Sequence, residues 1–187
     1  MSKNVLVPIA DGSEELEAVA IIDVLRRAEA EVTVASVSGA RQITASRGMV
    51  LIADALLEDC LDQEYDLIVL PGGIPGADHL RDSADLIALL KGQVESGLLY
   101  AAICASPAVV LEHHGLLNGR RATAHPYIAA ELTNQDAVNQ SVVVDANCVT
   151  SQGAGTAVDF ALTLVEQLFG KEKQIELAKG LALPTPG

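Results

Sequence analysis

The chain has 187 residues, of which half are apolar and only 3% are aromatic, and its net charge is −13. This length and apolar content exclude a globally disordered chain and suit one domain, residues 1–187, with a core of Ala, Val, Leu and Ile. The strong negative charge disfavours binding to nucleic acid or to an anionic membrane surface, because both need clustered Lys and Arg.

The three cysteines, Cys60, Cys104 and Cys148, lie far apart, and the sequence contains no C-x-x-C motif. This spacing fits neither a disulfide framework nor a zinc site, and it suits a reducing compartment. The first residues run into a short apolar strand without the layout of a signal peptide, and no apolar run has membrane-spanning length. We therefore expect a cytoplasmic protein that holds no metal.

The first elements in chain order are a buried strand over 5–10, a turn, and a helix over about 14–28, for which Ser13 is a plausible N-cap. The apolar face of this helix has residues at helical spacing: Ile21, Val24, Leu25 and Ala28.

Extending this face towards the start of the helix reaches Glu17 and Glu14. A carboxylate at Glu14, in the first turn, complements the helix dipole and needs no further explanation. Glu17 lies one turn further along, on the face that packs on the core, where a carboxyl group must be paired or protonated. The alternative is a partly exposed residue at the edge of that face.

The next segment predicts a strand over 31–37, short β segments near 42–45 and 50–53, helical turns over 56–61, and a strong central strand over 65–70. Cys60 then belongs to the helical turns as a semi-buried structural residue.

Gly72 and Gly73 directly follow the central strand, and this position leaves backbone N–H groups free near a ligand. The surrounding sequence has neither a G-x-G-x-x-G nor a G-x-x-x-x-G-K-[ST] motif, so a nucleotide site is not favoured. A helix over 83–95 follows.

An apolar strand over 98–103 ends on Cys104, and a helical pattern begins after Pro107. Such a thiol lies at the carboxyl end of a strand and the amino end of a helix, where open α/β sheets bind ligands. The helix dipole would lower the thiol pKa there. The alternative is a buried structural cysteine.

The remaining pattern predicts a short strand over 120–125 that ends at His125, a hairpin of 141–146 and 148–151, a helix that starts near 153–156, and a last helix over 171–182. His113 and His114 are neighbours on a helix and point in different directions, so a solvated helix end is favoured over a metal pair.

This alternation of strands and helices predicts one doubly wound α/β domain. Because crossovers are right-handed, the carboxyl ends of parallel strands gather at one edge of the sheet. We expect that edge to hold these residues: Glu17, Gly72, Gly73, Cys104 and His125.

Six stretches of the chain, in this order, resemble the ThiJ/PfpI superfamily, and within it the branch of parkinsonism-associated deglycases and bacterial YajL-type proteins. They are residues 11–17, 23–27, 70–73, 101–105, 123–126 and 150–156. The resemblance implies a flavodoxin-like three-layer sandwich with a mostly parallel sheet and a nucleophile elbow, a homodimer, and a site without a cofactor.

The resemblance also assigns roles to residues of the site. Cys104 is similar to the nucleophile, Glu17 to the carboxyl group that hydrogen-bonds its sulfur, and His125 to a nearby histidine that is poorly aligned as a general base. Gly73 and Ala105 match the N–H donors of an oxyanion hole.

Four further residues belong to the expected substrate-binding part of the site. Arg27 and Arg47 match arginines that line an anion-binding spot, Arg47 coming from the partner subunit. Gly72 is expected to take part in substrate binding. Ser106 stands where these relatives usually have Gly or Ala, and it could add a hydrogen bond near the thiol.

The resemblance implies a deglycase or glyoxalase that acts on methylglyoxal, glyoxal or their adducts on glycated groups and releases lactate or glycolate. The alternative function is a redox-sensing chaperone that uses oxidation of Cys104. Ala105 occupies the position at which the peptidase branch has a histidine, and this argues against a protease.

Overall fold

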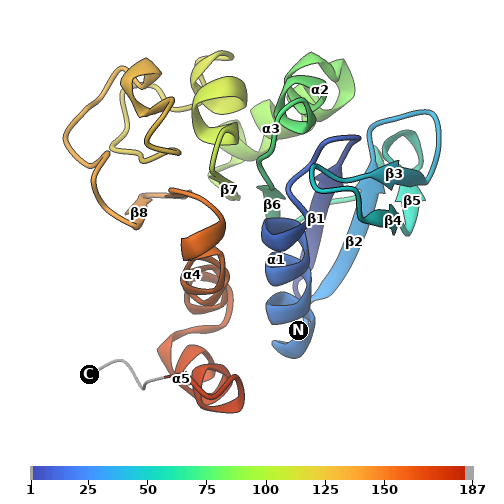
Figure 1. Ribbon diagram of the computed structural model, residues 1–187. Coiled ribbons are helices and arrows are strands. Elements are labelled where there is room, and N and C mark those ends of the chain that lie inside the picture. Colours follow the sequence, from blue (N-terminus) through green and yellow to red (C-terminus); the bar gives the residue numbers. More distant parts are fainter. Residues whose placement is uncertain (1, 184–187) are drawn as a thin grey trace.

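The computed structural model describes residues 2–183, in which a seven-stranded sheet lies between two layers of helices (Figure 1). The strand order is β5-β2-β1-β6-β7-β9-β8, and every pairing is parallel except that of β8 with β9. The strands are β1 (Asn4–Ile9), β2 (Glu31–Ser36), β5 (Ala55–Leu56), β6 (Leu67–Leu70), β7 (Leu99–Ile103), β8 (Val142–Asp145) and β9 (Cys148–Ser151). The predicted flavodoxin-like α/β class is confirmed.

The helices divide between the two faces of the sheet. One face is covered by α1 (Glu15–Arg27) and α4 (Ala157–Phe169), which pack together, and α5 (Lys171–Gly180) packs on α4. The other face is covered by α2 (Gly76–Asp82), α3 (Ala84–Ser96) and η2, a π-type helix over Pro107–Glu112.

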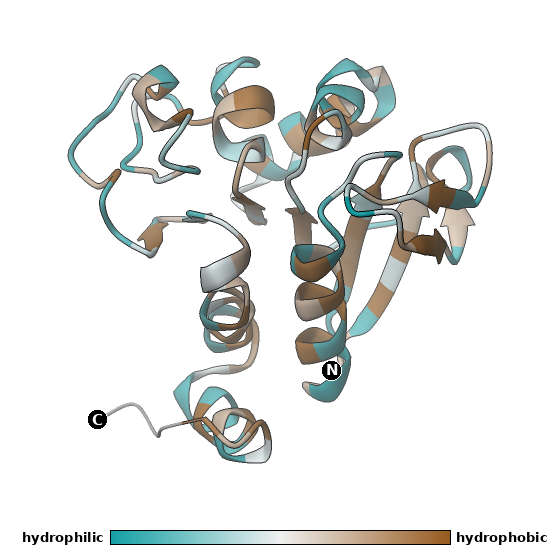
Figure 2. Cartoon of the chain, in the orientation of Figure 1, coloured by the Kyte–Doolittle hydropathy of each residue, from teal (hydrophilic) through white to brown (hydrophobic). Residues whose placement is uncertain are grey.

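Alternate residues of the strands supply two separate cores. In β1, the side chains of Val5, Val7 and Ile9 pack with α1 and α4, whereas Leu6 packs with the opposite layer. All four are fully buried, as expected for a parallel strand covered on both faces. Figure 2 shows the resulting concentration of apolar residues on the strands and on α1.

Shorter elements connect these layers. The segments predicted near 42–45 and 50–53 form an antiparallel pair, β3 (Gln42–Thr44) and β4 (Val50–Ile52). Three 3₁₀ segments complete the list: η1 (Leu57–Cys60), η3 (Ala129–Glu131) and η4 (Ala154–Thr156). Cys60 and Cys148 are both buried, so the packing of these two thiols is structural.

The structure corrects three local predictions. Residues 120–125 form no strand; instead, side chains bind their N–H groups, since Thr123 N donates to Thr150 Oγ1 at 3.0 Å and Arg121 N donates to Asp145 Oδ2 at 2.9 Å. Ser13 is not the N-cap of α1, because its Oγ accepts the Ala10 N–H at 3.0 Å. The short helix α2 was not predicted, because its Pro-Gly start resembles a loop.

Within residues 2–183, no helix is both long and apolar enough to cross a membrane. The tail beyond residue 183, which the sequence predicts to fray at its two prolines, lies outside the described residues.

Candidate active site

Cys104 lies in a tight elbow directly after β7, with a backbone φ of +65°. This left-handed conformation is unfavourable for a side chain with a Cβ, so neighbouring bonds must hold it. Cys104 N donates to Ser151 O at 3.0 Å, and His125 N donates to Cys104 O at 2.7 Å. The elbow is therefore anchored on one side by β9 and on the other by the segment of His125.

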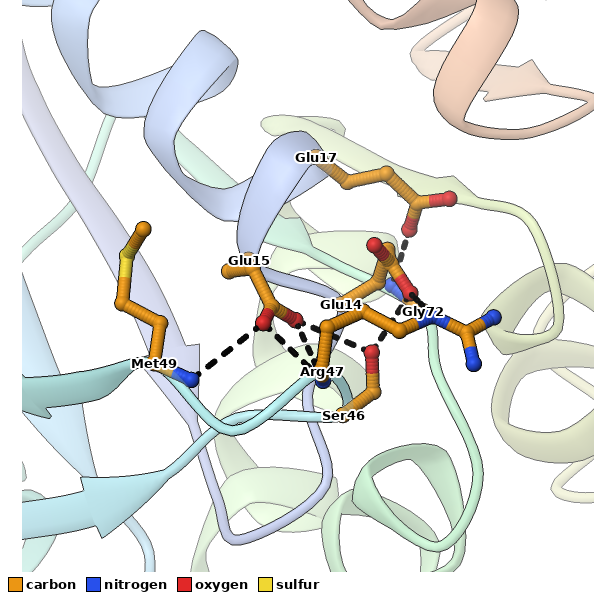
Figure 3. A network of polar contacts seen from close by, with 7 residues as sticks. All are labelled: Glu14, Glu15, Glu17, Ser46, Arg47, Met49 and Gly72. Carbon is orange, nitrogen blue, oxygen red and sulfur yellow. Dashed lines mark hydrogen bonds and ion pairs between the residues drawn. The ribbon is translucent and has the colours of Figure 1, made fainter.

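Glu17 lies on the core-facing side of α1 and is fully buried. Its Oε2 accepts the Gly72 N–H at 2.8 Å, as the dashed line in Figure 3 shows. Its Oε1 is also buried, and no described group donates a hydrogen bond to it. Burial raises the pKa of Glu17 to about 7 against the opposing effects of the Gly72 N–H and the Cys104 thiol. The carboxyl group is thus poised to exchange a proton near neutral pH.

The thiol of Cys104 is partly buried, and this burial, together with the Glu17 carboxylate, raises its pKa to about 12. The N–H groups of Gly73 and Ala105 face the sulfur and lower the pKa by a smaller amount. The expectation of a lowered thiol pKa is therefore wrong for an ionised Glu17, because desolvation and the like charge outweigh the helix end. The thiol beside Glu17 therefore stays protonated at neutral pH and is not a free thiolate.

The loop after β6 brings the backbone donors to this pair. Ser106 Oγ donates to Pro71 O at 2.6 Å and ties the loop to the segment after the elbow. A Cβ on Gly72 would lie 2.5 Å from Cys104 Cβ, so no larger residue fits between the loop and the thiol. Gly73 adopts a φ of +87°, and a Cβ there would lie 2.4 Å from Gly12 O. These close approaches require both glycines.

His125 reaches the site although it does not end a strand. Its Nδ1 accepts the Tyr127 N–H at 3.3 Å, so the neutral ring carries its proton on Nε2. A Cβ on Gly153 would lie 3.3 Å from His125 Cδ2 and 3.9 Å from both Cys104 Sγ and Glu17 Oε1. The absence of a side chain at Gly153 therefore lets these three groups approach one another.

A hollow of about 470 Å³ opens above the thiol. Its lining residues are Glu14, Ser46, Arg47, Gly73, Ile74, Cys104, Ala105, His125, Tyr127, Ile128 and Glu131. A second hollow of about 600 Å³ lies beside α3, away from Cys104, and it has neither the thiol nor Glu17.

Of the two arginines expected at the site, one lines the hollow and the other does not. Arg47 lines the hollow of its own chain, whereas the resemblance placed it in a partner subunit, and its Nε lies 4.0 Å from Glu14 Oε2. Arg27 does not line the hollow; it lies ten residues after Glu17, about 15 Å along the helix axis. There its Nε pairs with Asp23 Oδ2 at 2.6 Å.

A polar network holds the Arg47 loop against the start of α1 (Figure 3). Ser46 Oγ donates to Glu14 Oε2 at 2.6 Å, and Glu15 accepts from Arg47 N at 2.9 Å and from Met49 N at 3.4 Å. Burial acts to raise the pKa of Glu15, but hydrogen bonds from its own backbone N–H, from those of Arg47 and Met49, and from Ser46 outweigh it and lower the pKa. Glu15 therefore stays charged and fixes one wall of the hollow.

Sequence reasoning missed several residues of the hollow. Glu14 was explained by the helix dipole alone, and Ser46, Ile74, Tyr127, Ile128 and Glu131 were not identified. The position of Tyr127, two residues after His125, was the available signal for one of them.

In the part of the chain that the structure describes, no three His, Cys, Asp or Glu side chains are grouped so that they could hold a metal ion.

Comparisons with known proteins match this arrangement to one family. The DJ-1/PfpI family profile matches residues 3–167. The chain is 53% identical to Protein DJ-1 homolog B of Arabidopsis thaliana over 94% of the chain and 40% of that protein. It thus spans less than half of the length of the first two curated relatives, both from Arabidopsis.

Other relatives match over almost their full length. The chain is 42% identical to Protein dj-1beta of Drosophila melanogaster, with 97% of each covered. It is 37% identical to a protein of Caenorhabditis elegans named glutathione-independent glyoxalase DJR-1.2, over 97% of the chain and 96% of that protein. The solved structure of oxidised Toxoplasma gondii DJ-1 superimposes with a TM-score of 0.95 at 47% identity, covering 97% of this chain and 99% of that one. The chain belongs to the DJ-1/PfpI family.

Proposed function

We propose that this protein is a cysteine-dependent glyoxalase and deglycase, which converts methylglyoxal, glyoxal or their adducts to lactate or glycolate. The observation that carries the proposal is the convergence of the Cys104 thiol, the buried Glu17 carboxyl and two N–H donors beneath one hollow. The name of the Caenorhabditis relative supports the same reaction class.

The first step is attack of the Cys104 sulfur on the aldehyde carbon of methylglyoxal. Glu17 takes the thiol proton, the carbon–sulfur bond forms, and the carbonyl electron pair moves onto oxygen. The N–H groups of Gly73 and Ala105, which face the sulfur, hold this oxyanion. Glu17 then passes the thiol proton to the oxyanion, which gives a hemithioacetal and leaves Glu17 ionised for the next step. Their position is that of an oxyanion hole, and Nε2–H of His125 offers a further donor to the substrate.

The second step moves a proton from the former aldehyde carbon to the neighbouring carbonyl carbon through an enediol. Glu17, with a pKa of about 7, is suited both to remove and to return that proton. The product is a thioester of lactate on Cys104, and water hydrolyses it to lactate and the free thiol. The oxidation of one carbon balances the reduction of the other, so no redox cofactor is consumed.

Lactate production by two variants tests this mechanism. Cys104→Ser removes the nucleophile and is expected to abolish turnover of methylglyoxal. Glu17→Gln keeps the shape of the side chain but cannot carry the proton, so turnover is expected to fall by about 10²-fold or more. Cys60→Ser, at a buried position outside the hollow, serves as the control with normal turnover. Normal lactate production by both site variants would contradict the proposal.

Repair of adducts needs a separate measurement. A peptide treated with methylglyoxal and freed of excess reagent is incubated with the protein and a scavenger in excess. If the protein repairs adducts directly, they disappear faster with protein and scavenger than with the scavenger alone. If the protein only clears free methylglyoxal, adding it to the scavenger does not change the rate.

A redox-sensing role is the second candidate, supported by accessibility. Cys104 is partly exposed, whereas Cys60 and Cys148 are 1% and 2% exposed. Peroxide therefore reaches Cys104 first, and Glu17 is placed to hydrogen-bond the oxidised sulfur. Mass spectrometry after mild peroxide treatment is expected to find added oxygen on Cys104; oxidation of Cys60 at equal speed would contradict this role.

A homodimer is part of the proposal because apolar residues of α1 and the β3–β4 pair remain exposed. Leu16 and Val19 lie one turn apart on α1, and Met49, Val50 and Ile52 lie on and before β4. The Met49–Glu15 hydrogen bond holds the two elements together. We propose that this apolar surface is the contact between the two copies. We also propose that residues 1–187 form one domain and that the protein acts in the cytoplasm.

A further inference from the structure

We propose that the mouth of the hollow selects α-oxoaldehydes and adducts that carry a positively charged group, and that Glu131 and Tyr127 determine this preference. The inference rests on the proposed function, because it concerns which substrate reaches Cys104. It adds two residues that contact the non-reacting part of the substrate.

The size of the hollow requires such contacts. Its volume of about 470 Å³ far exceeds the needs of a three-carbon compound, while the thiol and its N–H donors occupy only the floor. A substrate with a larger substituent therefore extends past the thiol. Its substituent meets the side chains around the opening, among them Ile74, Tyr127 and Glu131.

The charges around the opening do not cancel. Arg47 and Glu14 face each other with 4.0 Å between Nε and Oε2, so they largely compensate. Glu131 also lines the hollow, and no Lys or Arg within residues 2–183 lies within 4.0 Å of its carboxylate. Glu17 below the floor adds negative charge when it ionises. The ring of His125, which also lines the hollow, lies tilted against that of Tyr127. The unbalanced charge is therefore negative.

Tyr127 provides the second contribution. Its side chain is 97% exposed, and its ring centroid lies 4.9 Å from that of His125 at the edge of the hollow. A side chain exposed to this extent does not pack in the core, so core packing does not account for an aromatic residue at this position. A cation over a tyrosine face is attracted by the ring quadrupole, whereas an anion is not. Glu131 and Tyr127 thus favour the same sign of charge.

Two thiol reagents with the same reacting group and opposite charge measure this preference directly. Methanethiosulfonates that carry a trimethylammonium or a sulfonate group both form a disulfide with Cys104 and release methanesulfinate. The ratio of their rates cancels the reactivity of the thiol itself. Relative to the ratio for free 2-mercaptoethanol, we expect a preference for the cationic reagent at Cys104, with the modified residue identified by mass spectrometry.

The variants assign that preference to its residues. Glu131→Gln is expected to lower the cation-to-anion rate ratio on the order of fivefold, as one charge near the reagent would at high effective dielectric. Tyr127→Leu is expected to lower it by a smaller factor. Glu95→Gln on α3 removes the same charge away from the hollow and is expected to change the ratio less than twofold. Salt at 1 M is expected to remove most of the effect, because screening is then strong.

Two outcomes would overturn the proposal. An unchanged ratio in Glu131→Gln and Tyr127→Leu would exclude both residues as determinants. An equal change in Glu95→Gln would assign the preference to the net charge of the whole chain. Neither outcome depends on catalysis, so a protein without lactate production would contradict the proposed function alone.

Turnover provides the functional counterpart. Phenylglyoxals with a para trimethylammonium or a para carboxylate group present the same reacting carbon with opposite charge. We expect a lower KM for the cationic compound in the wild type, and Glu131→Gln is expected to bring the two KM values together with little change in kcat. A change confined to kcat would assign Glu131 to the chemical step and contradict a role in selection.

Discussion

At the scale of single residues, the carboxyl group of Glu17 links the chemistry of the site to folding. It is fully buried, bonded by one oxygen to Gly72 N, and protonated more readily than a carboxyl in water. A group of this kind contributes to the free energy of unfolding in a way that depends on pH.

The contribution of Glu17 to the stability of the protein is expected to fall between about pH 4.5 and pH 7. Over this window the unfolded chain loses the proton of Glu17, with its ordinary pKa of 4.5, whereas the native chain, with a pKa of about 7, still holds it. The native state therefore binds more protons, and raising the pH lowers the free energy of unfolding by roughly 3 kcal/mol for this shift.

Urea unfolding of the wild type and Glu17→Gln at several pH values isolates this contribution. The variant cannot ionise at position 17. The unfolding free energy of the wild type minus that of the variant is therefore expected to fall by roughly 3 kcal/mol as the pH rises to about 7. Above pH 7 this difference is expected to level off. A difference that stays constant with pH would contradict the raised pKa.

The residues show what sequence can and cannot predict at this scale. Helical spacing alone placed Glu17 on the buried face of α1, and the structure confirms that position. The thiol pKa was misjudged, because sequence indicates a helix end but not the extent of burial or the approach of a second acid. Arg27 follows the family pattern in sequence, yet its partner in this chain is Asp23.

At the scale of elements, the site depends on how closely the loop after β6 approaches the elbow after β7. Gly72 and Cys104 follow the adjacent parallel strands β6 and β7, so their loops leave the sheet side by side. Backbone rather than side chain fills the space between them.

Gly72→Ala is therefore expected to damage both stability and turnover. Its Cβ would lie 2.5 Å from Cys104 Cβ and 2.9 Å from Glu17 Oε2, so the loop must shift. We expect a loss of about 1–3 kcal/mol in urea unfolding and a fall in lactate production of roughly tenfold or more, because the N–H donors move with the loop.

Gly92→Ala is the matched control for this substitution. Gly92 lies inside α3, and a Cβ there would meet no atom within 4 Å. It is expected to stabilise the protein by about 0.5–1 kcal/mol, since alanine loses less entropy in a helix, and to leave turnover unchanged. Wild-type turnover in Gly72→Ala would show that the loop does not position the donors.

The elements also show which structures the sequence pattern predicts and which it does not. Long periodic segments such as α1 and α3 were predicted within one or two residues, because one apolar face determines them. The segment over 120–125 reads as a strand in sequence, but side chains of β8 and β9 bind its N–H groups instead of a neighbouring strand. Such pairing depends on tertiary position and leaves no local signal.

At the scale of the whole molecule, the exposed apolar surface of α1 and β4 is expected to join two copies. Ile52 is 71% exposed and Leu16 is 58% exposed, although both are large and apolar. Burial of such side chains in an interface is favourable by the hydrophobic effect, and a lysine there would have to lose its hydration.

Light scattering coupled to size exclusion checks this expectation. The wild type is expected to have the mass of a dimer at micromolar concentration, and Ile52→Lys that of a monomer. Leu98→Lys places the same charge on a 40% exposed leucine outside this surface and is expected to remain dimeric. A monomeric wild type would contradict the proposed dimer contact.

The bond from Cys104 N to Ser151 O has a consequence for the synthesis of the chain. The ribosome makes β1, β6 and β7 before β9, so the thiol emerges before the acceptor that holds its left-handed backbone. Gly153, which leaves room for Glu17 and His125 beside the sulfur, emerges later still. A nascent or truncated chain that ends before β9 therefore exposes an ordinary cysteine, and the reactive arrangement arises only when the sheet is nearly complete.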